Sequence, residues 1–294
     1  MSLATDHTFH IGEQHVRTGK PCQDYTLSGT VGDTLAYAIV SDGCSSGGLT
    51  DIGARLMVLA TKRAILEVLT ERNIPQDAAA VMAINSVRDT YLRQYQTDLE
   101  LEVSDLLATC LWAVATPDIV LAHIVGDGVV AVEYEEDLVL HSFTWAKNMP
   151  YYPAYALDES TERFKTAHAE SEMPLTYIEE STSPTGMGGI PDGTLDELAV
   201  DEGIAGVIVA CGHSEPGYSP GKVTAIALFS DGVTQVDKLS MPETVKQLMA
   251  FKSTSGQFAT RRMNRFLTDV KKTGRGPLDD IAYAVITLRN ETET

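Results

Sequence analysis

The sequence predicts an α+β fold in which helices and sheets form separate layers. Apolar runs of strand length cluster in the middle of the chain, and helical patterns come in pairs. The order is strands, helix pair, strands, helices and a last strand, whereas βαβ units would alternate strand and helix one by one. With 294 residues, 44% of them hydrophobic, the chain can bury one large core. We therefore expect a single domain over 1–294.

The first predicted strand is short and apolar, and a pair of helices follows it. Residues 35–40 (LAYAIV) end at a turn, Ser41-Asp42-Gly43. Thr50 is an expected N-cap, and apolar residues repeat at helical spacing from there toward the break at Pro75. The stripe of the second helix consists of Val81, Ile84, Val87, Tyr91 and Tyr95. Such a one-sided stripe predicts packing on a sheet rather than cofactor binding.

The middle and the end of the chain complete the predicted sheets. Strand-like runs cover 106–115, 119–125, 129–134 and 138–143, and the short turns between them predict an antiparallel meander. Between 144 and 201 the periodicity fades, which indicates a long loop of the kind that is usually functional or mobile. Strands are expected again over 206–210 and 223–229, helices over 242–251 and 258–272, and a last strand over 281–288.

Composition excludes several classes of partner. The formal net charge is −19, from 41 acidic and 22 basic residues, and it repels a nucleic-acid backbone and an anionic membrane alike. The N-terminus shows no basic segment followed by an apolar core, and no apolar stretch is long enough to span a bilayer. The four cysteines lack zinc-type spacing and the density of a disulfide scaffold. We expect a cytoplasmic protein that binds neither nucleic acid nor membrane.

Acidic residues recur where an apolar strand meets a tight turn. The four sites are Ser41-Asp42-Gly43, Gly126-Asp127-Gly128, Ser230-Asp231-Gly232 and Leu278-Asp279-Asp280, and Gln23-Asp24 lies near the first strand. One Asp-Gly pair is an ordinary turn, but strands that bring several together create carboxylates that repel unless cations separate them. Hard oxygen ligands suit Mg²⁺ or Mn²⁺, and the lack of well-spaced His and Cys argues against structural zinc. Two-metal activation of water is the chemistry suggested.

This ordered set of acidic motifs resembles the type 2C family of metal-dependent serine/threonine phosphatases, and the resemblance covers nearly the whole chain. It implies a four-layer α-β-β-α sandwich with two central, mainly antiparallel sheets and metals at the sheet edge. By the same resemblance, Asp42 bridges two Mn²⁺ or Mg²⁺ ions and the Gly43 carbonyl binds one of them. Asp231 and Asp279 complete the ligands of the other, and Asp24 holds metal-bound waters. Asp127 would join Asp231 at a third, weaker metal.

The implied activity is hydrolysis of phosphoserine and phosphothreonine esters by a water that two divalent metals activate. The catalytic residues expected from the resemblance are Asp24, Asp42, Asp231 and Asp279. The implied partners are a phosphorylated protein substrate and a cognate serine/threonine kinase or its targets. The variable flap expected within 144–201 would select the substrate protein. The compact, acidic chain resembles stand-alone bacterial members with a signalling role, and we expect a monomer.

The sequence departs from the family pattern at two positions. Family members usually carry a phosphate-binding arginine five residues before the first aspartate, where this chain has Gly19; Arg17 and Lys20 are the candidate replacements. Cys44 follows Gly43 where animal members have a histidine, and a thiol beside an acidic cluster is a poor nucleophile. His15 lies upstream, but an incidental position is favoured for it, and the general acid stays unassigned.

Other phosphate chemistries fit the sequence less well. None of the four cysteines has an arginine six residues later, as a cysteine-based phosphatase requires, and neither Gly-Lys pair continues as a nucleotide-binding loop would. The remaining alternative is a catalytically weak or inactive phosphatase-like protein that binds a phosphorylated or regulatory partner. The missing arginine favours that alternative, and the retained aspartates argue against it.

Overall fold

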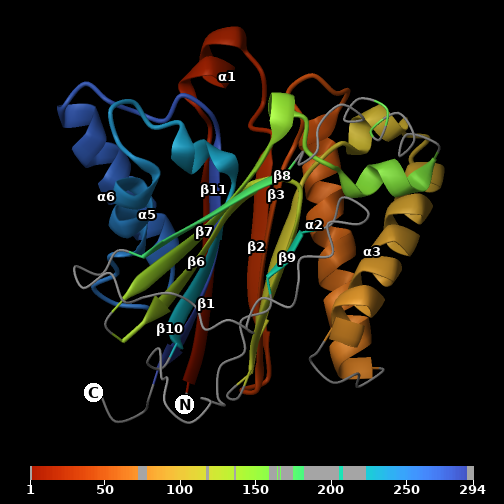
Figure 1. Cartoon of the computed structure of the whole chain (residues 1–294), viewed down its shortest axis with the longest axis horizontal. Helices are drawn as coiled ribbons and strands as arrows, with labels where there is room; N and C mark the ends of the chain where they lie inside the picture. The colour runs from red at the N-terminus through yellow and green to blue at the C-terminus, as the bar shows by residue number, and fades with distance from the viewer. Residues whose placement is uncertain are drawn as a thin grey trace.

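The structure is a computed structural model, shown in Figure 1. It describes residues 2–71, 78–116, 119–135, 137–158, 164, 166, 175–181, 205–207 and 223–289. Within these ranges, no helix combines the length and apolar character needed to cross a membrane.

Two antiparallel sheets occupy the centre of the molecule. In the described part of the chain one sheet has the order β1-β11-β10-β6-β7-β8, with β1 Ser2–His10, β11 Ile281–Arg289, β10 Val223–Phe229, β6 Gly128–Tyr134, β7 Leu138–Trp145 and β8 Leu175–Ser181. The other has the order β2-β3-β4-β5-β9, with β2 Asp24–Val31, β3 Leu35–Asp42, β4 Cys110–Ala115, β5 Val120–Val125 and β9 Ala205–Val207.

Helices cover both outer faces of this pair of sheets (Figure 1). On one side lie α2 (Thr50–Leu66), which continues as a π-helical turn η1 (Glu67–Glu71), and α3 (Ala78–Asp98). On the other side lie α5 (Met241–Met249) and α6 (Phe258–Lys272). The predicted four-layer α-β-β-α sandwich with two central antiparallel sheets is therefore confirmed.

Short helical elements connect the layers at the sheet edges. They are α1 (Glu13–Thr18) and the 3₁₀ turns η2 (Val103–Leu106), η3 (Ala146–Asn148), η4 (Pro153–Leu157) and η5 (Asp231–Thr234). In Figure 1, α1 lies at the end of the sandwich opposite the start of β1 and the end of β11. Of these elements, α1, η3 and η5 contribute residues to the region described below.

The central strands are buried on both faces, which explains their continuous apolar sequences. Along β11, Ala282, Ala284 and Ile286 belong to the core that includes the second sheet, α2 and α3. The alternate residues Ile281, Tyr283 and Val285 belong to a second core with α5 and α6. Because side chains alternate between the faces of a strand, a strand between two apolar layers must be apolar at every position.

The predicted meander is only partly correct. The pairs β4-β5 and β6-β7 are antiparallel, as expected, but β5 and β6 lie in different sheets. The chain crosses between the sheets at Gly126-Asp127-Gly128, where both glycines have positive φ values of 112° and 140°. The first run also begins later than predicted, because 103–106 form the 3₁₀ turn η2 and β4 starts at Cys110.

Four strands differ from the sequence expectation. The sequence did not predict β1 and β2, whose alternating polar residues give no continuous apolar run. The long loop expected over 144–201 contains the 3₁₀ turns η3 and η4, and at 175–181 the strand β8, which pairs with β7 and adds an edge strand. Of the strand predicted over 206–210, β9 covers 205–207 and the remainder lies outside the described residues, as does most of the predicted flap.

Candidate active site

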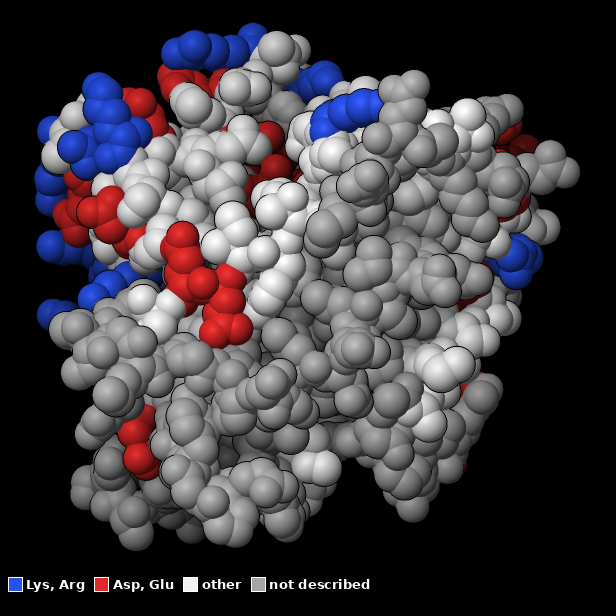
Figure 2. All heavy atoms as spheres, in the orientation of Figure 1, with Lys and Arg blue, Asp and Glu red and all other residues white. Residues whose placement is uncertain are grey.

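Each sheet contributes two of the predicted carboxylates to one edge of the sandwich. In the sheet that contains β2 and β3, Asp24 begins β2 and lies directly opposite Asp42 at the end of β3. In the sheet that contains β10 and β11, Asp231 follows β10 and Asp279 precedes β11, and these two strands pair with each other. Figure 2 shows acidic atoms recessed in a hollow at this end of the molecule, with Lys and Arg atoms on the surrounding rim.

A buried serine joins the two sheets at this edge. The Ser230 hydroxyl donates a 2.6 Å hydrogen bond to the Asp24 carboxylate in the other sheet. The same oxygen accepts a 2.9 Å bond from the backbone N–H of Ala282 in β11. Ser230 is fully buried, so it holds Asp24 and the β10-β11 pair at a fixed separation.

A glutamine that sequence reasoning missed links the other two carboxylates. Gln235 Nε2 donates to Asp231 Oδ2 and to Asp279 Oδ2, at 3.2 Å each. An amide nitrogen has two hydrogens, so one side chain can orient both carboxylates. Its position four residues after Asp231, across the helical turn η5, is the signal that could have identified it.

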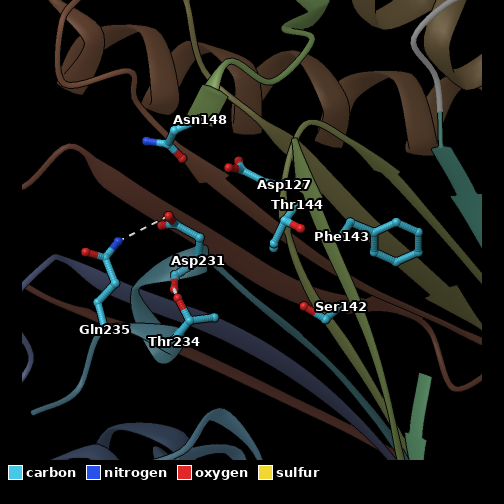
Figure 3. Close-up of a pocket in the computed structure, with 9 residues that line it drawn as sticks. Asp127, Ser142, Phe143, Thr144, Asn148, Asp231, Thr234 and Gln235 are labelled. Carbon is cyan, nitrogen blue, oxygen red and sulfur yellow. Dashed lines mark hydrogen bonds between the residues drawn. The ribbon is translucent and has the colours of Figure 1, made fainter. Parts of the chain in front are cut away.

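Asp127 lies where the chain crosses from one sheet to the other. The residue is 8% exposed, and its carboxylate is hydrogen-bonded to its own backbone N–H and to no other described residue. A pocket of about 300 Å³ opens beside it, with Asp231 also on its wall. Figure 3 shows Asp127, Asp231, Thr144 and Asn148 around this common space, while the ring of Phe143 points away from it.

The electrostatics of this cluster disfavour its ionised form. Burial is the main reason that the pKa of Asp24 and of Asp42 lies well above the usual range, and neighbouring carboxylate charges raise both further. Burial also raises the pKa of Asp231. Burial, followed by the charge of Asp231, raises the pKa of Asp127 to about 7. A divalent cation binds oxygen ligands, and its charge offsets the repulsion between buried carboxylates.

Gly43 also fits a role as a carbonyl ligand. Its N–H donates to the Gln23 carbonyl at 3.1 Å, while its own carbonyl oxygen accepts no hydrogen bond from the described residues. A Cβ at this position would lie 2.5 Å from the backbone oxygen of Thr50, so a side chain would displace the start of α2. The residues present therefore fit a divalent-metal centre.

A second cluster has a structural role. Ligand atoms of His15, Asp279 and Asp280 lie within 4.8 Å of one another. The Asp280 oxygens, however, accept from the N–H of Gly12 at 2.7 Å and of Gln23 at 2.6 Å, and His15 Nδ1 lies 2.8 Å away. With both oxygens engaged, Asp280 fastens the two ends of the segment that contains α1. Sequence reasoning assigned no role to Asp280 and favoured an incidental position for His15.

The two candidate phosphate-binding residues lie in different surroundings. Arg17 is exposed and forms an ion pair with Glu13 at 2.7 Å along α1. Lys20 Nζ donates to the backbone oxygen of Ser45 at 3.0 Å, next to the turn that contains Gly43. The structure therefore places the ammonium group of Lys20 against the loop that follows Gly43, and Arg17 on the outer surface of α1.

Tyr152 is a further neighbour that the sequence did not indicate. Burial raises its pKa, and interactions with Cys44, Asp127 and Asp42 raise it further. Its side chain therefore remains a neutral hydroxyl group close to the acidic cluster. The Cys44 thiol lies 3.3 Å from the Ser46 hydroxyl. Tyr152 lies within the unstructured stretch that the sequence predicted, where no periodicity marks individual residues.

Comparison with known proteins identifies the family of the chain. Three solved structures, each 11% identical in sequence, resemble it. A bacterial serine phosphatase that bears a point mutation has a TM-score of 0.55, and the match covers 98% of this chain and 100% of that chain. The serine/threonine phosphatase Stp1 from Staphylococcus aureus has a TM-score of 0.51, with coverage of 99% and 96%, and the serine/threonine phosphatase of S. agalactiae has a TM-score of 0.50, with coverage of 98% and 100%. At this identity they support the fold alone. None of the curated sequences compared matches. The family model for protein phosphatase 2C, however, matches residues 11–269. The chain belongs to the protein phosphatase 2C family.

Proposed function

We propose that the protein is a metal-dependent protein phosphatase that hydrolyses phosphoserine and phosphothreonine esters. The observation that carries this proposal is the meeting of Asp24, Asp42, Asp231 and Asp279 from two sheets at one edge, in a chain of this family. Their burial and mutual repulsion support the binding of cations there.

In this proposal Asp42 and the Gly43 carbonyl hold one of two Mn²⁺ or Mg²⁺ ions, and Asp42, Asp231 and Asp279 hold the other. Asp24 would orient water, and Asp127 with Asp231 would hold a third ion. When bound, such ions acidify water and offset charge on the phosphoryl oxygens.

The neighbouring residues position these ligands. Ser230 holds Asp24, and Gln235 holds Asp231 and Asp279. We infer that Lys20, whose ammonium group lies beside the Gly43 turn, attracts the substrate phosphate.

The expected setting is also a proposal. We propose a phosphorylated protein as substrate, a cognate serine/threonine kinase or its targets as partners, and action as a cytoplasmic monomer in signalling. The net charge of −19 supports the expectation that neither nucleic acid nor an anionic membrane is a partner.

A second candidate function is a phosphatase-like protein that binds a partner without turnover. It is favoured by Gly19 in place of the expected arginine, and by the engagement of Arg17 with Glu13 instead of the acidic cluster.

The test measures hydrolysis of a phosphothreonine peptide and of an aryl phosphate with Mn²⁺, Mg²⁺ or a chelator. Wild type is compared with Asp42→Asn and Asp231→Asn, and Asp33→Asn, an exposed residue, is the matched control. Calorimetry measures metal binding, and circular dichroism checks folding. Metal-dependent turnover that falls at least about a hundredfold in both site variants, with the control unchanged, supports the phosphatase. A folded wild type that binds Mn²⁺ but hydrolyses neither substrate supports the binding protein.

A further inference from the structure

Basic residues gather on the outer layer that α5 and α6 form. Residues 246–275 contain eight of the 22 basic residues of the chain and one of its 41 acidic residues. Eight cations against one anion give this stretch a formal net charge of +7, in a chain whose total is −19. Figure 2 shows Lys and Arg atoms along the edge of the molecule where Figure 1 places α6. The surface is therefore divided between a basic face and an acidic remainder.

The basic side chains of α6 lie on its solvent side. The inner side of the helix is apolar, and Phe258, Met263 and Phe266 are buried there in the core with α5. The outer side consists of exposed residues that recur every three or four positions: Arg261, Asn264, Arg265, Thr268, Lys271 and Lys272. At a rise of about 1.5 Å per residue, these six residues span about 16 Å. We call them the α6 face.

Helix stability does not account for the charges at the start of this face. Arg261 lies in the first turn of α6, where the helix dipole disfavours a cation. Arg265 follows four positions later on the same side, where like charges repel. Arg261 donates a 2.8 Å hydrogen bond to the backbone oxygen of Ser255, which leaves its charge without a counterion.

The described part of the chain neutralises only a fraction of this charge. The carboxylate of Asp269 lies 2.8 Å from Arg265 and 3.0 Å from Lys272. Among the described residues, no carboxylate forms an ion pair with Arg261 or Lys271. The α6 face therefore keeps a net positive charge that a ligand can contact.

The α6 face suits a short acidic segment of a protein better than a larger polyanion. Charges are screened over about 8 Å at physiological ionic strength, so this face acts locally although the whole chain is negative. A nucleic-acid duplex or an anionic membrane extends well beyond the face and meets the acidic remainder. Residues 246–275 also expose no large apolar side chain that could insert into a membrane or stack on a base.

We propose that the α6 face is a docking surface for an aspartate- or glutamate-rich segment of a partner protein. In extended form, about five residues at about 3.3 Å each span it. Arginine binds carboxylates through paired N–H groups, and lysine adds a point charge. The face belongs to an outer layer, whereas the candidate metal ligands lie at the sheet edge. The inference goes beyond the proposed function and does not depend on turnover.

The test measures peptide binding to the full chain by fluorescence anisotropy. The probe is a fluorescein-labelled peptide with consecutive glutamates, and the reference peptide has glutamines in their place. At about 0.15 M NaCl we expect a dissociation constant at least about tenfold lower for the glutamate peptide. The difference should shrink in about 0.5 M NaCl, because salt screens exposed charges.

Charge reversals assign the binding to one face of the molecule. The double variant Arg261→Glu with Lys271→Glu should weaken binding of the glutamate peptide at least about tenfold. The matched control, Arg55→Glu with Lys62→Glu, makes the same change in net charge on α2, in the opposite outer layer. It should change the dissociation constant by less than about twofold, since charges beyond the screening length contribute little.

A third variant should strengthen binding. Asp269→Asn removes the carboxylate that competes for Arg265 and Lys272. We expect the glutamate peptide to bind about two- to fivefold more tightly, which corresponds to release of surface ion pairs. Circular dichroism checks the folding of every variant. If the double variant of α6 does not fold, Asp269→Asn decides, and unchanged binding in it contradicts the proposal.

Two further results would overturn the proposal. One is equal binding of the glutamate and glutamine peptides, and the other is a loss in the α2 control as large as in the α6 variant. A short DNA duplex and vesicles with phosphatidylserine are measured in the same way. If either binds more tightly than the glutamate peptide, and only the α6 reversal removes that binding, the face is not a site for a protein segment. A protein that hydrolyses no phosphoester fails the proposed function, and the binding data still decide the docking surface.

Discussion

The hydroxyl of Ser230 donates a 2.6 Å hydrogen bond to the carboxylate of Asp24, across 206 positions of sequence. This contact joins the two sheets at the edge where the candidate metal ligands meet. Replacing Ser230 with alanine leaves the buried Asp24 carboxylate without that donor. We expect the free energy of unfolding to fall by about 1–3 kcal/mol and Mn²⁺ affinity to fall with it. Urea unfolding and calorimetry measure the two effects.

The matched control for Ser230 is Ser255→Ala, an exposed serine, which should change stability by less than about 0.5 kcal/mol. A Ser230→Ala protein with unchanged stability and Mn²⁺ affinity would show that the hydroxyl does not hold the two sheets together.

Asp280 fastens the segment that contains α1 to the last strand. It accepts from the N–H groups of Gly12 and Gln23 while it contacts His15. Asp280→Ala removes these bonds and leaves buried donors unpaired, so we expect a loss of about 3 kcal/mol or more in unfolding free energy. Asp280→Asn keeps one acceptor oxygen and should lose less. If Asp280→Ala is as stable as Asp33→Ala, a control at an exposed position, the interpretation is wrong.

Substitution by alanine is expected to have opposite effects on protein stability at Gly232 and at Gly276. A Cβ at Gly232 would overlap the backbone oxygen of Asp280, whereas a Cβ at Gly276 meets nothing within 4 Å. We expect Gly232→Ala to destabilise the protein by at least about 1–3 kcal/mol, because the backbone must shift. Gly276→Ala should be neutral or stabilise by up to about 1 kcal/mol, because it restricts the unfolded chain. Thermal unfolding distinguishes them, and equal shifts would contradict the predicted close approach.

Lys20 and Arg17 can be separated by kinetics. Lys20 lies beside the Gly43 turn, and Arg17 forms an ion pair with Glu13 on the surface. We expect Lys20→Ala to raise KM for a phosphopeptide by about five- to tenfold, the effect of losing one charge-assisted contact, and Lys20→Arg to restore it. Arg17→Ala should change KM by less than about twofold, since a surface ion pair contributes little. The reverse order would assign phosphate binding to Arg17.

Because His123 is buried, we expect the protein to lose stability in mild acid. Burial, followed by the charge of Arg88, lowers the pKa of His123 to about 3, and its ring stacks on Trp112. In the unfolded chain the pKa is about 6.5, so below that pH the unfolded state binds a proton that the folded state does not. The stability that neutral His123 contributes is thus present above about pH 6.5 and is lost as pH falls toward 3.

The expected loss from this one group between about pH 7 and pH 5 is about 2 kcal/mol. Over the same pH interval, the free energy of unfolding of His123→Gln should fall by about 2 kcal/mol less than that of the wild type, whatever the stability of the variant at neutral pH. Urea unfolding of both proteins at the two pH values isolates this group, because the other titrating groups cancel in the difference. Parallel decreases would mean that His123 is protonated in the folded protein.

Much of the local structure could be read from the sequence because its causes are local. Continuous apolar runs marked β3, β10 and β11, and α6 spans the residues predicted for it. Asp-Gly turns at the strand ends marked Asp42, Asp127 and Asp231 as candidate ligands. Strand β1 was missed because alternating polar residues along SLATDHTFH give no continuous apolar run, although it pairs with β11 along its whole length.

The sequence by itself determined which residue types stand at the strand ends, and hence that several carboxylates were available as candidate metal ligands. Only the tertiary structure decided which of these groups meet. The crossing of the chain at Gly126-Asp127-Gly128 put β5 and β6 in different sheets and placed Asp127 on a pocket wall. Ser230 contacts Asp24, and Asp280 contacts Gly12 and Gln23, across more than 200 positions of sequence. No local pattern encodes contacts that form only when distant segments pack together.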